Sequence, residues 1–313
     1  MTSEEVNALI MKAKMLGAYK SIGTACGKNC MLISISDENH ILVIPDEVRL
    51  INGSEAAYLN KDLRFTLELQ KYRGNLKVVG GNGLTDTSFM FYRTNFDNID
   101  FSEFNTIKVR KMKSMFDHCN AIYIDLHNIK TNSCITMESM FEMCDCEELD
   151  LSKFDVRQVR NMSNMFSECQ ADLIDISSFD KNIVSTMEFM FDSVHAEVLG
   201  LRKLCTSYVR SMTSMFQDSS IPYIDASNFD FRSLKYIDSM FSGCQSKEIR
   251  LRGNNLDLSR VTDNANSNLA NLGNRYTNVF SNSEAVVETD SKDIMNLIKQ
   301  SKCHVEIVEK HWQ

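Results

Sequence analysis

Charged side chains recur in this chain at multiples of 25 residues, in one acidic and one basic series. The acidic series is Asp100, Asp125, Asp150, Asp175 and Asp225, and the basic series is Arg110, Arg160, Arg210, Lys235 and Arg260. A line of carboxylates could hold a cation or a basic partner, whereas a line of guanidinium and ammonium groups could bind phosphates or an acidic protein surface. Either kind of binding requires a fold that places every twenty-fifth residue on one face.

Each series also has a purely structural interpretation. A serine follows four of the five aspartates by two residues, so each carboxylate could instead accept hydrogen bonds from the turn after it. These serines are Ser102, Ser152, Ser177 and Ser227. The basic series follows an apolar column and therefore points outward, where its stems could simply cover the edge of the core. We take the basic series as the candidate partner-binding surface and the acidic series as the alternative.

No arrangement of catalytic residues stands out. The segment Gly23–Asn29 (GTACGKN) is only superficially similar to a phosphate-binding loop. It has three residues between its glycines where four are needed, and an asparagine where a hydroxyl must reach Mg²⁺. The six histidines share no short metal-binding spacing, and Cys26 and Cys30 lack a second pair at zinc-finger spacing. We therefore expect no enzyme, no cofactor and no metal site, with an enzyme housed in the N-terminal segment as the weaker alternative.

A repeat marked by the dipeptide Met-Phe aligns the charges. Seven copies occur at a spacing of 25 residues, and their phenylalanines are Phe91, Phe116, Phe141, Phe166, Phe191, Phe216 and Phe241. A strict period of this length indicates stacked supersecondary units, and we expect these phenylalanines to form one continuous buried stack. The acidic column lies between two apolar columns, represented by Ile99 and Phe101 in the first copy. This alternation predicts one short strand per repeat with one buried face.

The segment 140–169, MFEMCDCEELDLSKFDVRQVRNMSNMFSEC, carries nearly every column of the repeat. It resembles the BspA-type leucine-rich repeat in its 25-residue form, and the resemblance extends from about Leu76 to Leu251. The resemblance implies a right-handed, leucine-rich-repeat-like solenoid with one parallel strand per rung. It also implies membership of a family known mostly as bacterial surface and binding proteins without catalytic activity. The last copies depart from the pattern, since Arg250 stands where the repeated aspartate is expected.

We expect an α/β fold in three parts: an N-terminal α/β cap with irregular first rungs over 1–75, the parallel β solenoid over 76–262, and a C-terminal cap over 263–313. Small α/β segments at both ends would cover the apolar ends of the array.

Local patterns assign elements to the two caps. In the N-terminal part they predict a helix from Thr2 to about Gly17, a hairpin of strands over 30–36 and 40–45, and strand candidates at 48–51, 63–69 and 76–81. In the C-terminal part they predict a loop over 264–282, a helix over 290–301 with Asp290 as N-cap, and a strand over 304–309.

Composition bears on partners and compartment. The formal net charge of −8 argues against sequence-independent binding to nucleic acid, so a nucleic acid would be contacted only indirectly, through a nucleoprotein partner. The N-terminus lacks the pattern of a secretory signal, and no run of about 18 apolar residues could span a membrane. Ten cysteines are consistent with reduced thiols in the cytoplasm. The column of Cys119, Cys144, Cys169 and Cys244 could hold buried thiols or disulfides between neighbours.

These observations predict a non-catalytic protein-interaction scaffold that acts inside the cell and binds a protein partner through the solenoid surface. One alternative is an inhibitor, carried by a phage or mobile element, of a bacterial defence nuclease such as a CRISPR effector. A second alternative, from the resemblance, is a bacterial surface adhesin module. The sequence leaves the oligomeric state and the binding face open.

Overall fold

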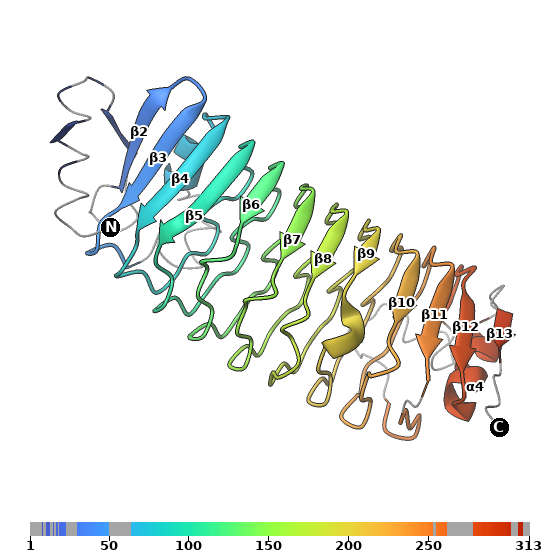
Figure 1. Ribbon diagram of the computed structural model, residues 1–313. Helices are drawn as coiled ribbons and strands as arrows, with labels where there is room; N and C mark the ends of the chain where they lie inside the picture. The colour runs from blue at the N-terminus through green and yellow to red at the C-terminus, as the bar shows by residue number, and fades with distance from the viewer. Residues whose placement is uncertain are drawn as a thin grey trace. The chain divides into compact units, whose positions relative to one another are not determined.

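The computed structural model describes residues 30–49, 64–252, 255–261 and 278–301, together with short pieces near the ends (8, 11–12, 15, 17, 19–22 and 306–308). The chain forms two compact units, Met1–Asp155 and Val156–Gln313, and each is described by itself. The division falls inside the predicted repeat segment. Both units consist mainly of parallel β-strands with few helices (Figure 1).

In the first unit the strands follow one another across the sheet in chain order. Its described strands are β1 Tyr19–Ile22, β2 Cys30–Ser36, β3 Asn39–Ile44, β4 Asn75–Gly80, β5 Asn98–Phe104, β6 Tyr123–Asp125 and β7 Glu148–Asp150. The first three are antiparallel neighbours, and pairing is parallel from β3 onwards. The predicted hairpin is confirmed, and the strand candidate at 76–81 corresponds to β4. From β5 onwards one short strand recurs every 25 residues, as predicted.

The strand prediction at 63–69 is wrong. This segment forms helix α3, Arg64–Leu69, because Thr66 and Leu69 share one buried helical face while Leu67 is exposed. The alternating sequence LRFTLEL imitates a strand, but packing against the first repeat decides otherwise. Val48 and Arg49 are not part of a strand, and the rest of the candidate at 48–51 lies outside the described residues. Of the predicted helix from Thr2 to Gly17, the structure describes a few residues, which include helical Ala8, Met11, Lys12 and Met15.

The second unit continues the same pattern. Its described strands are β8 Leu173–Asp175, β9 Val198–Leu199, β10 Tyr223–Asp225, β11 Glu248–Leu251, β12 Val286–Thr289 and β13 Glu306–Val308. The strands β8 and β9 pair in parallel, as do the strands from β10 to β13. A short 3-10 helix, η1 Leu201–Lys203, follows β9 directly. The predicted C-terminal helix and strand are confirmed as helix α4, Lys292–Gln300, and strand β13. The predicted N-cap, Asp290, is wrong: Ser291 is the N-cap, and its side chain accepts a hydrogen bond from Ile294 N.

The repeated phenylalanines stack ring on ring within each unit, and all seven are buried. In the first unit the ring centroids of Phe91, Phe116 and Phe141 are 5.4 Å and 5.2 Å apart. In the second unit the successive spacings of Phe166, Phe191, Phe216 and Phe241 are 5.4 Å, 5.3 Å and 5.4 Å. The predicted buried stack is therefore confirmed within each unit.

Phe280 adds a further ring to the stack of the second unit. Its ring lies 5.2 Å from that of Phe241 and nearly parallel to it. Within the predicted loop over 264–282, residues 278–282 form the turn of one more repeat, which the sequence did not indicate. Residues 264–277 lie outside the described part. The repeat was hidden because 39 residues rather than 25 separate the two phenylalanines and because Val279 replaces the methionine.

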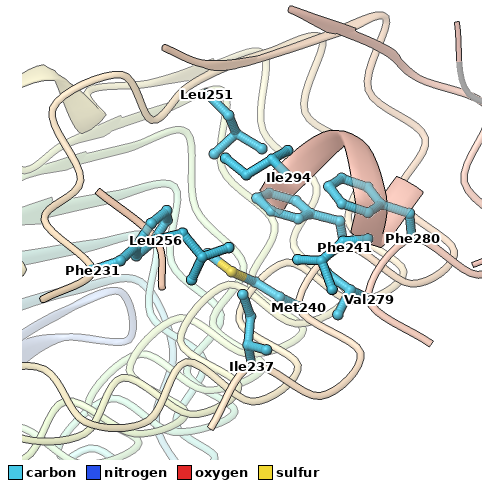
Figure 2. Close-up of a pocket in the computed structure, with 10 residues that line it drawn as sticks. Phe231, Ile237, Met240, Phe241, Leu251, Leu256, Val279, Phe280 and Ile294 are labelled. Atoms are coloured by element: carbon cyan, nitrogen blue, oxygen red, sulfur yellow. The ribbon is translucent and has the colours of Figure 1, made fainter. Parts of the chain in front are cut away.

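Helix α4 closes the apolar interior of the second unit. Figure 2 shows Leu251, Ile294 and Phe280 around a small cavity beside Phe241, and every lining residue is apolar. The volume is about 10 Å³, so the cap leaves little empty space in the core. Its apolar lining offers no hydrogen-bond partner to a water molecule.

Backbone hydrogen bonds link each turn to the next in one direction. In the turn that carries Phe116, Phe116 N donates to Met140 O at 2.8 Å and His118 N donates to Glu142 O at 2.7 Å. Such bonding requires left-handed φ angles at two positions per turn, here Ser114 (51°) and His118 (55°). Among the described residues, every non-glycine residue with positive φ occupies the repeat position of Ser114 or that of His118. Within this turn, each repeat therefore presents N–H donors to the following repeat and carbonyl acceptors to the preceding one. Elsewhere in the repeat the bonds also run the other way, as from Arg210 N to Ser185 O.

The direction of these hydrogen bonds determines which hydrogen-bonding groups each cap must supply. Asp117 O accepts from Arg93 N, one repeat earlier, at 2.9 Å. Its counterpart in the first repeat is Tyr92 O, which accepts from Gln70 Nε2 at 2.8 Å, while Thr66 Oγ1 of α3 donates to Phe89 O at 2.7 Å.

The opposite end of the array needs an acceptor instead of donors. There, Ser301 Oγ accepts from Phe280 N at 3.4 Å and donates to Leu297 O at 2.8 Å. The N-terminal cap thus supplies side-chain donors, and the C-terminal cap supplies a side-chain acceptor.

The repeated cysteines pack as small apolar residues. Cys119, Cys144, Cys169 and Cys244 are all buried. In the first unit Cys119 and Cys144 are thiols and not a disulfide, which favours the first of the two interpretations there. The neighbouring thiols of Cys119 and Cys146, together with burial, raise the pKa of Cys144 well above its ordinary value. Burial likewise raises the pKa of Cys134 to about 12.

The aromatic stack makes a first prediction. Phe191→Ala removes a ring that packs between Phe166 and Phe216 and should lower the free energy of unfolding by about 3–5 kcal/mol. Urea unfolding followed by circular dichroism measures the change. The matched control is Tyr208→Ala, which truncates an exposed ring and should change stability by less than about 0.5 kcal/mol. Equal losses in both variants would contradict a buried, stabilising stack.

The N-terminal cap makes a second prediction. The double change Thr66→Val and Gln70→Met keeps most of the side-chain volume but removes both donors to the first turn. The free energy of unfolding should fall by about 1–3 kcal/mol, since hydrogen bonds to buried carbonyls are lost. Thr85→Val is the control, because its hydroxyl donates at the surface, to Arg49 O, where water can replace it. A double variant as stable as the control would show that the cap acts through apolar packing alone.

Thiol reactivity makes a third prediction. In a variant carrying Cys26→Ser, Cys205→Ser and Cys303→Ser, the remaining thiols should react with a disulfide reagent at pH 8 only after denaturant is added, because burial blocks the access of the reagent. Restoring the half-buried Cys205 should restore one fast-reacting thiol. Fast labelling of Cys119 or Cys144 in the folded protein, located by mass spectrometry, would contradict the packing described above.

Candidate functional site

All five residues of the basic series are exposed. In the second unit, backbone hydrogen bonds keep their positions in register: Ser185 N donates to Arg160 O at 3.0 Å, Arg210 N to Ser185 O at 2.9 Å, and Lys235 N to Arg210 O at 2.7 Å. Because these bonds join successive repeats, Arg160, Arg210 and Lys235 lie along one line. Arg110 occupies the same column in the first unit.

Four of these cations have no internal counter-ion. Arg110, Arg160, Arg210 and Lys235 make no ion pair with any other residue in the described part of the chain. Arg260 differs, because its Nε lies 3.2 Å from Asp257 Oδ2. The sequence therefore located an exposed basic line, but its last member is already engaged in an ion pair.

Two exposed apolar side chains accompany the basic line in the second unit. Ile183 is 42% exposed and Tyr208 is 60% exposed, and each lies two residues before a position of the basic column. We name the surface of Arg160, Ile183, Tyr208, Arg210 and Lys235 the basic face. Ile183 and Tyr208 were not singled out from the sequence. The signal was available, because both are apolar in a column that carries polar residues at Lys108, Ser133 and Gln158.

Every aspartate of the acidic series accepts a hydrogen bond from the backbone two residues later. The donors are the N–H groups of Ser102, His127, Ser152, Ser177 and Ser227, at 2.7, 3.2, 2.9, 2.8 and 3.2 Å from the respective Oδ1 atoms. The carboxylates thus shape the turn after each strand, as their structural interpretation expects.

In the first unit, cationic or imidazole groups also contact this series. Lys77 Nζ lies 3.5 Å from Asp100 Oδ2, and His127 reaches Asp125 with Nδ1 at 3.0 Å and Asp150 with Nε2 at 3.2 Å. Partial burial would raise the pKa of Asp100, but the hydrogen bonds from Ser102 and the charge of Lys77 hold it below its ordinary value.

The pKa of Asp150 is lowered in the same way. Partial burial acts against the charged form, but the hydrogen bonds from Ser152 and the His127 ring outweigh it. The two ring nitrogens of His127 therefore face two different carboxylates, Asp125 and Asp150.

The acidic series is more open in the second unit. Asp175 and Asp225 use Oδ1 for the turn, and Oδ2 of each forms no hydrogen bond or ion pair with a described residue. Gly200 stands between them in the column, so no side chain fills the intervening position. The next member, Arg250, lies within electrostatic reach of Asp225, but its Nε is 2.7 Å from Glu248 Oε1 and 3.3 Å from Glu288 Oε2.

The described residues contain no group of three or more His, Cys, Asp or Glu side chains that could hold a metal ion. A cleft of about 510 Å³ runs along 243–247 beside Asn282 and Glu284. The loop-like segment Gly23–Asn29 lies outside the described residues. Within the part of the chain that the structure describes, no helix is long and apolar enough to cross a membrane.

Comparison with protein families agrees with the repeated architecture. Residues 70–174 and 171–281 give two tandem matches to the family described as "Mycoplasma protein of unknown function, DUF285". Comparisons with curated proteins and with solved structures find no match. The two family matches begin near the end of helix α3, extend to Phe280 and Ser281, and together cover more than half of the chain. The chain therefore belongs to the DUF285 family.

Proposed function

We propose that the protein is a non-catalytic scaffold that binds an acidic protein partner through the basic face. The proposal takes the repeats to form a leucine-rich-repeat-like solenoid of the BspA type, capped at both ends. Three observations favour this architecture: one parallel strand per 25 residues, the buried phenylalanine stacks, and the tandem family matches. Repeat arrays of this kind present long surfaces and are widely used for binding.

The absence of internal counter-ions on the basic face carries the proposal. Arg160, Arg210 and Lys235 are exposed and unpaired among the described residues, although the chain as a whole has a net charge of −8. An acidic chain that keeps a line of cations clear of its own carboxylates is arranged to attract an anionic surface.

The composition of the basic face fits a protein partner. Arg160 and Arg210 offer planar guanidinium groups that can bind carboxylates in a bidentate manner. Tyr208 and Ile183 supply apolar contact area beside them, and aromatic and arginine side chains together are typical of the residues that dominate binding energy at protein interfaces.

We further propose that the protein acts inside the cell. The support comes from Cys119 and Cys144, which are neighbours on successive repeats and yet remain thiols. Disulfides are rare in the cytosol, where thiols are kept reduced.

The double change Arg160→Glu and Arg210→Glu tests the binding proposal. It should leave the urea midpoint nearly unchanged, because exposed and unpaired charges contribute little to stability. Affinity for the partner isolated from the native cell extract should fall at least tenfold, and binding by the wild type should weaken as salt is added.

The matched control exchanges two exposed cations outside the basic face, Lys153→Glu and Arg202→Glu, and so alters the net charge by the same amount. The control should retain most of the affinity. If both double variants bind equally well, the basic face is a solvated surface and the proposal fails.

A further inference from the structure

We infer that the strand face of the second unit binds an extended basic segment of a partner, with a cationic side chain at every third position. This inference goes beyond the proposed function, because it concerns another face of the repeats and a ligand of opposite charge. The relevant residues are those that β8, β9 and β10 direct away from the core.

An apolar strip crosses these three strands on their outer side. Leu173, Val198 and Tyr223 occupy one repeat column, and Leu173 and Val198 are direct partners in the parallel pairing of β8 and β9. Leu173 is half-buried, whereas Val198 is 55% exposed and Tyr223 is 62% exposed. The next residue along each strand is buried, so the strip lies on the face opposite the core.

Open carboxylates border this strip. Asp175 and Asp225 stand two residues after Leu173 and Tyr223, and their Oδ2 atoms have no partner among the described residues. Gly200 stands two residues after Val198 and leaves the position between the carboxylates without a side chain. The first unit lacks this combination, because Lys77 and His127 already contact its carboxylates.

The pairing of apolar strip and open carboxylates favours arginine or lysine over other ligand groups. A long cationic side chain can lay its methylene stem on Val198 and bring its charged end to a carboxylate. The exposed ring of Tyr223 adds a site for a cation–π contact. An acidic segment is disfavoured at this face by like-charge repulsion.

The spacing of the repeats sets the spacing of the ligand. Parallel strands lie about 4.8 Å apart, so positions two repeats apart, such as Asp175 and Asp225, are separated by roughly 10 Å. A peptide in the polyproline II conformation rises about 3.1 Å per residue with three residues per turn, so every third side chain lies on one side, about 9.3 Å from the last. In a β-strand the corresponding distance between alternate side chains is only about 6.7 Å. A peptide crossing the strands in the polyproline II conformation therefore matches both carboxylates.

Short synthetic peptides test this inference with the full-length protein. The probe is a fluorescein-labelled peptide with arginine at every third position and proline and serine between them. A second peptide of the same composition carries its arginines in adjacent positions. Fluorescence anisotropy at low ionic strength should give at least fivefold tighter binding for the first peptide, because only its spacing matches the two carboxylates.

The test variant is the double change Asp175→Asn and Asp225→Asn. Asparagine keeps the side-chain oxygen that accepts from Ser177 N and Ser227 N, so the turns are preserved while the charges are removed. Affinity for the spaced peptide should fall about five- to tenfold, the range expected from two exposed ion pairs. A second variant, Val198→Ser, removes the apolar platform and should weaken binding about threefold without any change in charge.

The matched control is Asp100→Asn with Asp150→Asn, which removes the same charge from the first unit. This control should bind the peptide as the wild type does, because its carboxylates are already engaged. An equal loss in the control and test variants would mean that the peptide responds only to overall charge, and it would overturn the inference. Undiminished binding by the test variant would do the same.

The basic face provides an independent check. Arg160→Glu with Arg210→Glu should retain full affinity for the basic peptide, although the same change is expected to weaken binding of an acidic partner at least tenfold. Each proposal can therefore fail without the other.

Discussion

The one-way hydrogen bonding between successive turns is the constraint on which the rest of each unit depends. Each turn can donate to the next only if two of its residues adopt left-handed φ angles, and this fixes the path that delivers one phenylalanine per repeat to the core. The stacked rings then supply apolar burial at a spacing set by the backbone, between 5.2 and 5.4 Å. The exposed columns inherit the same register, which is why Arg160, Arg210 and Lys235 lie in line.

The sequence was sufficient to place the residues that follow the 25-residue repeat. It was not sufficient for residues outside that repeat. The Met-Phe spacing predicted the phenylalanine stacks and one strand per repeat, because in a strictly repeated chain one local pattern fixes every copy. Helix α3 was missed because an alternating sequence fits a strand as well as a helix until its packing is known. Phe280 was missed because additional residues shifted it out of register.

The candidate surfaces show a related limit. The sequence placed Arg160 and Asp175 on exposed columns, since each follows a buried residue at a fixed offset. Their ion pairs could not be predicted, because these depend on side chains from other columns. His127 engages Asp125 and Asp150, whereas no comparable group among the described residues reaches Asp175. Identical positions in the repeat thus have different electrostatic surroundings, and only three-dimensional contacts distinguish them.

The donor and acceptor sides of each Met-Phe turn also affect how such proteins change length during evolution. Since every repeat presents the same groups to its neighbours, duplication or deletion of a whole 25-residue block leaves both caps with unaltered chemistry. Extra residues that are not a whole block must leave the register of the stack intact, as the contact of Phe280 with Phe241 across 39 residues illustrates. Selection can therefore lengthen or shorten the surface by whole repeats. Insertions of any other length instead add a segment at the edge of the surface.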